Sequence, residues 1–158
     1  MQHAEFTRTI HAPIAQVWPL LADVTAVARW SPAVDKADLL TVQSAGLRAA
    51  RRCHFYDGTS VREEVIAVAD GRRVRVRLTE SSMPMKRLEA EFIVAETPEG
   101  HTKVTMALDY EVKWGLLGKL MGAMMVRGQL VKMETRALAG LNHYVTTGAV
   151  VGKDFVVA

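Results

Sequence analysis

The sequence predicts an α+β domain in which a curved antiparallel sheet of six to seven strands wraps around one long C-terminal helix. Alternating apolar and polar residues predict a first strand over residues 5–10 and several further strands between residues 36 and 114. Two short helical segments follow the first strand, and a longer helical pattern covers residues 119–144. Because a strongly twisted sheet of this size curls, the long helix can lie in its concave face.

The first thirty residues predict one strand and two short helices. Pro13 suits the first turn of a helix, where its missing N–H has no intrahelical partner, and apolar residues follow at helical spacing at Ile14, Val17, Trp18 and Leu21. Pro19 lies inside this helix, where proline costs about 3 kcal/mol, so we expect a bend or a restart there. Asp23 can cap a second helix over residues 24–30.

Turn residues divide the central part of the chain into hairpins. The Asp-Gly pairs at residues 57–58 and 70–71 are the strongest hairpin signals in the sequence. The strands expected around these and other turns cover residues 39–44, 48–56, 60–69, 73–80, 87–96 and 103–114. Their order along the chain predicts an antiparallel meander.

The C-terminal helix carries an apolar stripe that we expect to face the sheet. Over 26 residues from Lys119 to Tyr144, at about 1.5 Å per residue, this helix is about 40 Å long. Its stripe comprises Leu117, Met121, Met124, Gly128, Val131, Thr135, Leu138 and Val145. The tail that follows, residues 149–158, is apolar but short, and either adds a strand or frays.

Length and composition predict a single folded domain, residues 1–148, followed by the tail, residues 149–158. A chain of 158 residues with 49% hydrophobic and 23% charged residues can form an ordinary core, which excludes a disordered chain. The net charge is only +3 and the basic residues are spread among acidic ones, so we expect no nucleic-acid partner. Without an export signal, an apolar membrane span or a second cysteine beside Cys53, the expected location is the cytoplasm.

Three parts of the chain together resemble a known family. They are the opening FTRTIHAPIAQVWPLLADVTAVARWSPAV, the pair RRCHFYDG and VREEVIAVADGRRVRVRL, and the ending LAGLNHYVTTG. Over residues 4–148 the chain is similar to the polyketide cyclase/dehydrase branch of the START-like, Bet v 1-like (SRPBCC) superfamily. The resemblance implies the helix-grip fold and a cavity between the sheet and the long helix that binds an apolar small molecule. It implies no cofactor.

The residues themselves support a cavity only weakly. Methionine side chains are flexible and can adapt a wall to several ligand shapes, and glycine in a helix leaves volume free. The alternative is that methionine and glycine merely fill an irregular core. If the cavity exists, the residues expected to contact its ligand are Trp30, Val76, Leu78, Met83, Met85, Leu88, Phe92, Met106, Leu108, Tyr110, Trp114, Met121, Met124, Gly128 and Val131.

Catalysis in such a cavity would need polar groups among the apolar walls. If Ile66 and Val68 point inward, Glu64 does too, and a desolvated carboxyl group there would have a raised pKa. The face of the preceding strand that carries Arg52, His54 and Tyr56 would then complete a cluster able to bind a polar ligand group or move a proton. Sequence leaves open which face of residues 48–56 is inside. In the alternative, Arg52 and Glu64 form an ion pair on the convex face, worth about 0.2–1 kcal/mol.

Other chemistry finds little support in the sequence. No histidine pair has metal-ligand spacing, so we expect no metal site. Cys53 is more typical of a small buried residue than of a nucleophile. The arginines of residues 73–77 are expected to coat a solvent-facing strand opposite Glu89 and Glu91.

These observations leave three functional hypotheses. The first is a binding module, monomeric or homodimeric, that holds a lipid, a polyketide or an aromatic metabolite. The second is a cofactor-independent aromatase/cyclase that uses Arg52, His54, Tyr56 or Glu64 for aldol cyclisation and dehydration. The third is a regulatory module that binds other proteins. Contact with a membrane surface has weak support from Lys119, Arg127 and Lys132 near the start of the long helix.

Overall fold

The predicted α+β fold is confirmed. The computed structural model describes the backbone of residues 1–113 and 116–157, and the side chains of these ranges except those of residues 116–123. The helices are α1 (Ile14–Ala22), α2 (Val27–Trp30) and α3 (Leu116–Thr147). The strands are β1 (Gln2–Ile10), β2 (Val34–Leu39), β3 (Ala50–Phe55), β4 (Ser60–Ala69), β5 (Arg73–Thr79), β6 (Met85–Glu96) and β7 (Thr102–Val112).

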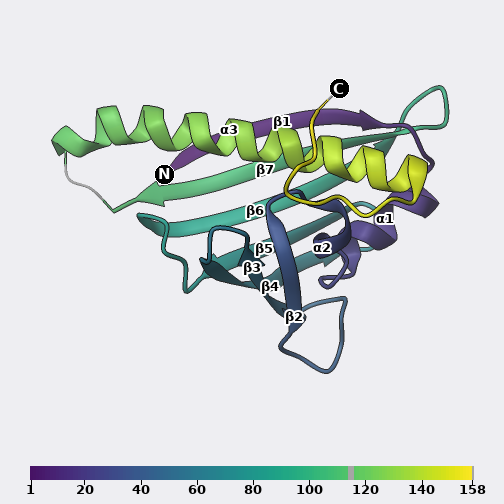
Figure 1. Ribbon diagram of the computed structural model, residues 1–158, viewed down its shortest axis with the longest axis horizontal. Coiled ribbons are helices and arrows are strands. Elements are labelled where there is room, and N and C mark those ends of the chain that lie inside the picture. The colour runs from purple at the N-terminus through teal and green to yellow at the C-terminus, as the bar shows by residue number, and fades with distance from the viewer. Residues whose placement is uncertain (114–115, 158) are drawn as a thin grey trace.

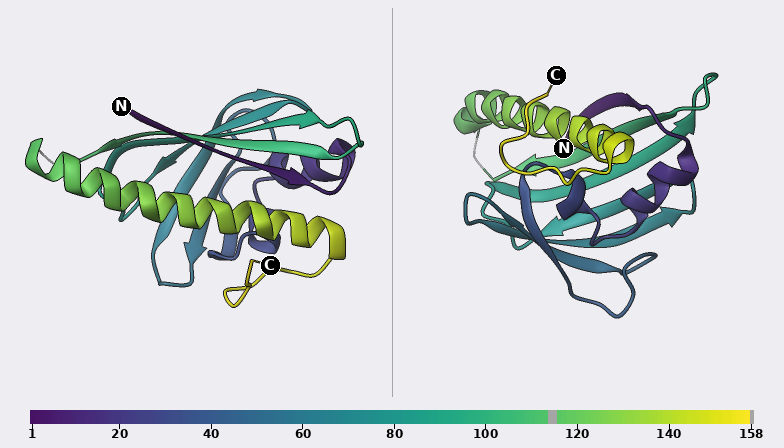
Figure 2. Two further views of the ribbon diagram at one scale, coloured as in Figure 1. Left: turned by 90° about the horizontal axis from the view of Figure 1, so that it is seen from above. Right: turned by 45° about the vertical axis from the view of Figure 1, so that its right-hand side comes forward.

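The strands form one antiparallel sheet in the order β1-β7-β6-β5-β4-β3-β2. Each hairpin places sequential strands side by side, and β1 joins the free edge of β7. Helix α3 lies along one side of the curved sheet and packs against β1, β7 and α2 (Figures 1 and 2). We call the side of the sheet that faces α3 the inner face and the opposite side the outer face.

Several predicted boundaries differ from the structure. The strand expected over residues 39–44 lies earlier, as β2, and residues 40–49 form an irregular loop. Helix α1 continues through Pro19 as one element, where a bend or restart was expected. The second helix is shorter than expected, because Asp23 accepts a hydrogen bond from the backbone N–H of Thr25 (2.9 Å) in a turn that precedes α2.

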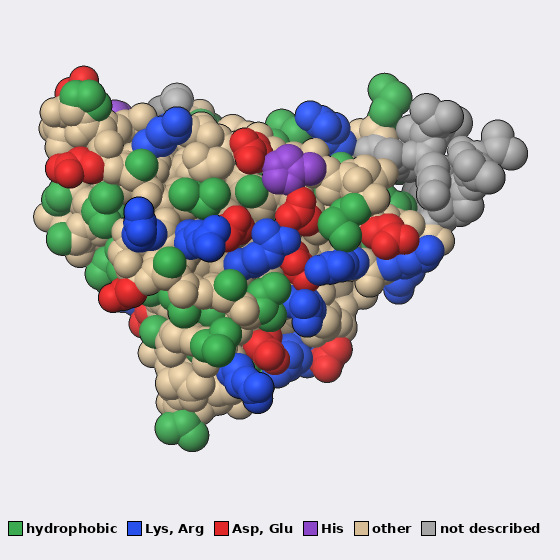
Figure 3. All heavy atoms as spheres, turned by 180° about the vertical axis from the view of Figure 1, so that it is seen from behind, with side chains coloured by type: hydrophobic (Ala, Val, Ile, Leu, Met, Phe, Trp, Pro, Cys, Tyr) green, Lys and Arg blue, Asp and Glu red, His purple; other side chains and the backbone are tan. Residues whose placement is uncertain are grey.

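The outer face of the sheet carries alternating charges, as predicted for the arginines of β5. Figure 3 shows basic side chains interleaved with acidic ones on this face. At its centre Glu89, only 2% exposed, accepts hydrogen bonds from Arg75 (2.8 Å), Arg77 (3.2 Å) and Arg87 (2.8 Å). Arg75 also donates to Asp109 (2.7 Å). These pairs, across strands for Arg75 and Arg77 and within β6 for Arg87, hold the basic residues in a neutralised network.

The tail neither adds a strand nor leaves the surface of the domain. After α3 the chain turns back and runs alongside α3 and α2 (Figures 1 and 2). The backbone N–H of Val151 donates to the carbonyl of Arg29 (2.9 Å), and the Val151 side chain is buried. Arg136 of α3 donates to the carbonyls of Lys153 (3.3 Å) and Phe155 (2.9 Å). The tail is therefore anchored by backbone hydrogen bonds and one apolar side chain.

Helix α3 approaches α2 closely at Gly140. A Cβ atom at this position would clash with the backbone oxygen of Trp30, so only glycine fits there.

Within the described part of the chain, no helix is both long enough and apolar enough to span a bilayer.

Candidate functional site

A cavity of about 490 Å³ lies between α3 and the inner face of the sheet. Its volume falls within the range of small-molecule sites, which is roughly 300–1,000 Å³. Most of its wall is apolar and comes from the inner face of β3 and of β5 to β7, from the α2 region and from α3. The apolar lining comprises Val27, Trp30, Val34, Phe55, Val76, Leu78, Met83, Leu88, Ala90, Phe92, Met106, Leu108, Leu130, Met133 and Ala137.

One aromatic pair fixes the shape of the wall near α2. The rings of Trp30 and Phe92 meet edge to face, with centroids 6.2 Å apart and an interplanar angle of 90°. The indole N–H of Trp30 donates to the carbonyl of Leu20 (3.1 Å). Because its polar atom is bonded outside the cavity, Trp30 presents an apolar surface to a ligand.

Three buried charged residues interrupt this apolar wall: Arg51 of β3, Glu63 of β4 and Glu134 of α3. Arg51 and Glu63 are opposite each other in the sheet register, and both are buried. The Nε of Arg51 donates to Oε2 of Glu63 (2.7 Å), and Nη2 donates to the same oxygen. Nη1 of Arg51 donates to the backbone oxygen of Val24 (2.7 Å). The guanidinium is thus held in place and neutralised by protein groups.

Glu134 is buried without a cationic partner. It is 5% exposed, and no other side chain in the described part of the chain forms a hydrogen bond or ion pair with it. Burial, helped by the negative charge of Glu63, raises the pKa of Glu134 to about 8. At neutral pH this carboxyl group is mostly protonated, so it can donate a hydrogen bond into the cavity.

Cys53 lies next to this cluster on the inner face of β3. Its side chain is 1% exposed, as expected for a small buried residue. Burial, together with the nearby charge of Glu63, raises the pKa of the thiol to about 12. A thiol that stays protonated at neutral pH is a poor nucleophile, so Cys53 is a structural residue.

Three of the four predicted catalytic residues do not reach the cavity, and their expected placement is wrong. Glu64 lies on the outer face and binds Arg62 (2.9 Å). Arg52 pairs with Glu80, and His54 Nε2 lies 2.8 Å from Asp38. The alternative expectation was an ion pair between Arg52 and Glu64 on the convex face. Both residues do lie on that face, but each pairs with a different residue.

The physical reason is that a bulge interrupts the alternation of β4. Val61, Glu63 and Val65 are buried on the inner face, and Val68, although 39% exposed, pairs with the buried Val74 of that same face. A bulge after Val65 shifts the register with β5. Alternation alone therefore could not identify the inner face.

Tyr56 is the one predicted catalytic residue that lines the cavity. It follows the end of β3 and is 43% exposed, beside Asp57 and Thr59 of the turn. Its phenol lies at a wall of the cavity that is open to solvent. A catalytic role for Tyr56 stays a prediction.

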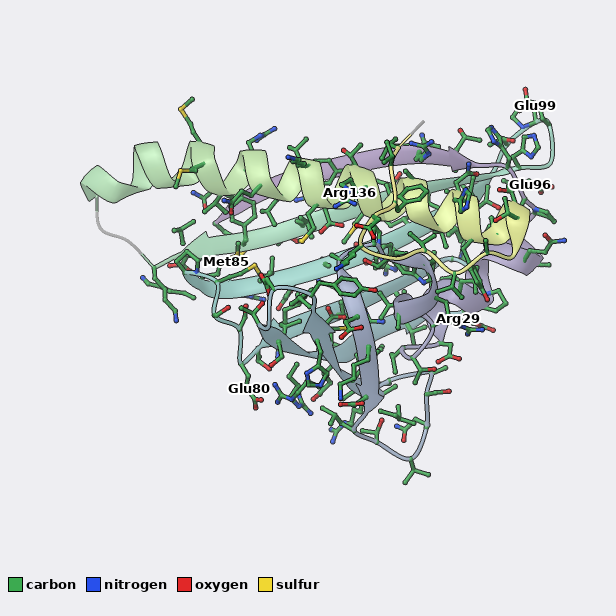
Figure 4. The ribbon with its side chains drawn as sticks, viewed as in Figure 1. Arg29, Glu80, Met85, Glu96, Glu99 and Arg136 are labelled. Atoms are coloured by element: carbon green, nitrogen blue, oxygen red, sulfur yellow. The ribbon has the colours of Figure 1, made fainter. Side chains whose placement is uncertain are left out.

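Eight of the predicted ligand-contacting residues line the cavity, and their contact with a ligand stays a prediction. They are Trp30, Val76, Leu78, Met83, Leu88, Phe92, Met106 and Leu108. Tyr110 is buried in the core and is absent from the cavity wall. Met85 lies at the end of β6 farthest from α1 and α2 (Figure 4), beside a smaller hollow. Trp114 and the side chain of Met121 are outside the described residues.

The predicted inward stripe of α3 is wrong at four positions. Met124 is 76% exposed, Val131 is 39% exposed, Thr135 is exposed, and Gly128 also faces outward, with no atom near the place of a Cβ. The inward positions are Val126, Leu130, Met133, Glu134, Ala137, Leu138 and Leu141. Because this helix has apolar residues on more than one side, periodicity did not single out the buried face.

The sequence analysis missed Arg51, Glu63 and Glu134. A signal for Glu134 existed, since Leu130, Ala137, Leu138 and Leu141 surround it at the three- and four-residue spacings of one helix face. A carboxyl group in the middle of such a face is uncommon and is a candidate functional group.

The cavity opens toward the tail. Lys153 of the tail and Arg136 of α3 line this side, and Figure 4 shows Arg136 where the tail passes α3.

No group of three or more metal-ligating side chains occurs among the residues described.

Residues 1–146 match the family model described as polyketide cyclase/dehydrase and lipid transport. None of the curated proteins compared with the chain matches it in sequence. The predicted resemblance to the START-like, Bet v 1-like superfamily is confirmed by the family match and by structural likeness.

Three solved structures illustrate that likeness. The XoxI protein of Bacillus cereus is 17% identical, with 93% of this chain and 97% of that chain covered and a TM-score of 0.76. The Zhui aromatase/cyclase of Streptomyces sp. R1128 is 18% identical, with 92% and 93% covered and a TM-score of 0.73. Major latex-like protein 151 of Panax ginseng is 14% identical, with 90% and 96% covered and a TM-score of 0.71. At these identities the likeness establishes a shared fold.

Proposed function

The chain belongs to the polyketide cyclase/dehydrase and lipid transport family, and from this premise we propose that it binds a hydrophobic small molecule in the cavity under α3. A lipid, a polyketide or an aromatic metabolite would fit this class. The observation that carries the proposal is the cavity of about 490 Å³ with its largely apolar wall.

The wall suits such a ligand energetically. Moving apolar surface out of water contributes roughly 25 cal/mol per Å², so a ligand that covers the exposed wall gains affinity from both surfaces. Met83, Met106 and Met133 contribute flexible side chains that can adjust to the shape of the ligand. A cavity of this volume also argues against the third hypothesis, a regulatory module that has a filled core and binds other proteins only through its surface.

The second candidate is a cofactor-independent cyclase, and Glu134 is the observation that favours it. A carboxyl group with a pKa of about 8 can donate a proton or a hydrogen bond to a ligand carbonyl near neutral pH. With Glu64, Arg52 and His54 on the outer face, this reading depends on Glu134 and Tyr56. Turnover of a poly-β-ketone substrate by the wild-type protein, lost in the Glu134→Leu variant, would favour the cyclase over the carrier.

The binding proposal is tested by native mass spectrometry of the isolated protein, followed by denaturing extraction of any retained molecule.

Ala90→Phe places a large side chain in the cavity from β6, and Ala67→Phe makes the same change on the outer face. We expect the wild-type protein and the Ala67→Phe variant to bind naphthalene in a calorimetric titration, and the Ala90→Phe variant to lose at least tenfold in affinity. Equal binding by all three proteins would contradict the proposal.

Other expectations from the sequence remain predictions. These are a cytoplasmic location, a monomeric or homodimeric state, the absence of a nucleic-acid partner and at most weak contact with membranes.

A further inference from the structure

The buried charged groups of the cavity differ in whether the protein itself supplies their hydrogen-bond partners. The charge of Arg51 is balanced by Glu63, and its third hydrogen bond goes to the backbone of Val24. Glu134 reaches the same region from α3, is about nineteen-twentieths buried and has no bonding partner among the described residues. The cavity therefore contains a buried carboxyl group that is free to form a hydrogen bond with a ligand.

We propose that Glu134 makes the cavity selective for uncharged apolar ligands that carry a hydrogen-bond acceptor, such as a ketone or ester carbonyl, and that it excludes carboxylates. This inference rests on the proposed function, because it assumes that the cavity binds an apolar molecule. It goes further by naming the chemical class of the ligand's polar group and the residue that binds this group.

Carboxylates are excluded because the described residues of the cavity wall include no unpaired buried cation to receive them. A ligand carboxylate beside Glu63 and Glu134 would be a third acid facing one guanidinium, and Arg51 already forms its ion pair. A desolvated anion without a partner is strongly disfavoured. A neutral carbonyl oxygen avoids this cost and accepts the proton that Glu134 can donate.

Ammonium ligands are disfavoured for a different reason. At neutral pH the protonated Glu134 offers no negative charge, since burial and the charge of Glu63 raise its pKa to about 8. Glu63, the buried carboxylate on the wall, is already paired with Arg51, so an ammonium group would lose its hydration without gaining an ion pair.

The interaction is coupled to pH through Glu134. The ionisable groups on the elements around it are Arg51 of β3, Glu63 of β4, Tyr56 and Asp57 at the β3–β4 turn, Arg136 of α3 and Lys153 of the tail. As the pH rises through about 8, Glu134 loses the proton that it donates. The affinity for a carbonyl ligand then falls, whereas the affinity for a hydrocarbon of the same shape changes little.

Four naphthalene probes of similar shape test the inference by calorimetric titration: 2-acetylnaphthalene, 2-ethylnaphthalene, 2-naphthoate and 1-(2-naphthyl)ethylamine. At pH 6.5 we expect the ketone to bind at least fivefold more tightly than the ethyl compound and at least tenfold more tightly than the carboxylate and the amine. Between pH 6.5 and 9.5 the preference for the ketone over the ethyl compound falls at least threefold.

Two variants isolate the role of Glu134. Glu134→Gln keeps an N–H donor but cannot titrate, so it retains a preference for the ketone that no longer depends on pH. Glu134→Leu loses that preference while still binding 2-ethylnaphthalene. Glu111→Gln, a matched change of an exposed carboxylate on β7, leaves every affinity unchanged.

The outcomes separate the inference from the proposed function. If no probe binds, both fail. If 2-ethylnaphthalene and 2-acetylnaphthalene bind equally, or Glu134→Leu keeps the ketone preference, the inference fails and the binding function stands. Tightest binding of the carboxylate or the amine would also overturn it.

Discussion

Two glutamates on opposite sides of the sheet are equally buried and behave in opposite ways. Glu89 on the outer face is 2% exposed, and Glu134 beneath the inner face is 5% exposed. Burial raises the pKa of both, but hydrogen bonds from Arg75, Arg87 and Arg77 outweigh it at Glu89 and lower its pKa. At Glu134 no cation opposes burial, and the pKa rises to about 8.

The difference shows that low exposure alone does not decide what a carboxyl group does, because its cationic partners matter as well. Glu89 is a permanent anion that ties strands β5 and β6 together on the outer face. Glu134 is an acid that keeps its proton near neutral pH and is left available to a ligand. One sheet therefore carries a structural charge cluster on one side and a candidate binding group on the other.

The largest expected effect comes from breaking the inner cluster at its cation. Arg51→Leu leaves Glu63 buried without its partner and Glu134 beside it, so we expect the free energy of unfolding to fall by about 3–5 kcal/mol. Urea denaturation at pH 7 measures this. The double variant Arg51→Leu/Glu63→Leu should recover most of the loss; no recovery would show that the charge imbalance is not the cause.

The outer cluster is tested at its central acid. Glu89→Gln weakens the hydrogen bonds from three arginines and should lower the free energy of unfolding at pH 7 by about 2 kcal/mol. Because the folded-state pKa of Glu89 is lowered, its stabilisation is present above its ordinary pKa of 4.5 and is lost as the pH falls below it. Denaturation between pH 3 and 7 should therefore be less acid-sensitive in the variant than in the wild-type protein.

Glu134 should show the opposite dependence on pH. Its folded-state pKa is raised, so the stability it contributes is full below the ordinary value of 4.5 and is lost as the pH rises from there to about 8. Glu134→Gln removes this loss, and we expect the variant to be more stable than the wild-type protein at pH 8.5 by about 1 kcal/mol. Equal stability of the two proteins from pH 5 to pH 8.5 would contradict the assigned protonation.

The smallest expected effect is at Glu64, which lies on the outer face and has one cationic partner, Arg62. Glu64→Gln should change the free energy of unfolding by less than about 0.5 kcal/mol. The affinity for 2-acetylnaphthalene should not change, because the side chain does not line the cavity. A tenfold loss of affinity in this variant would restore the original interpretation of Glu64 as a cavity residue.

Local patterns predicted the elements because each depends on near neighbours. The Asp-Gly turns at 57–58 and 70–71 each connect strands that pair in the structure, and β5 alternates as expected, with Val74 and Val76 buried. The same patterns predicted six residues of the apolar wall, since β5, β6 and β7 each have one clearly apolar face. The order of elements then left a single simple packing arrangement, a sheet curled around a helix.

The sequence by itself determined the α+β fold, the strand order of the meander and the apolar face of β5 to β7. Only the tertiary structure decided which face of β3, β4 and α3 points inward, because β3 and α3 carry apolar residues on both faces, a bulge interrupts the alternation of β4, and a period alone is then ambiguous. That choice brought Arg51 and Glu63 into the cavity and placed Arg52 and Glu64 outside it. Whether a buried carboxyl group is charged depends on cations supplied by other elements, and no cation of the described residues pairs with Glu134.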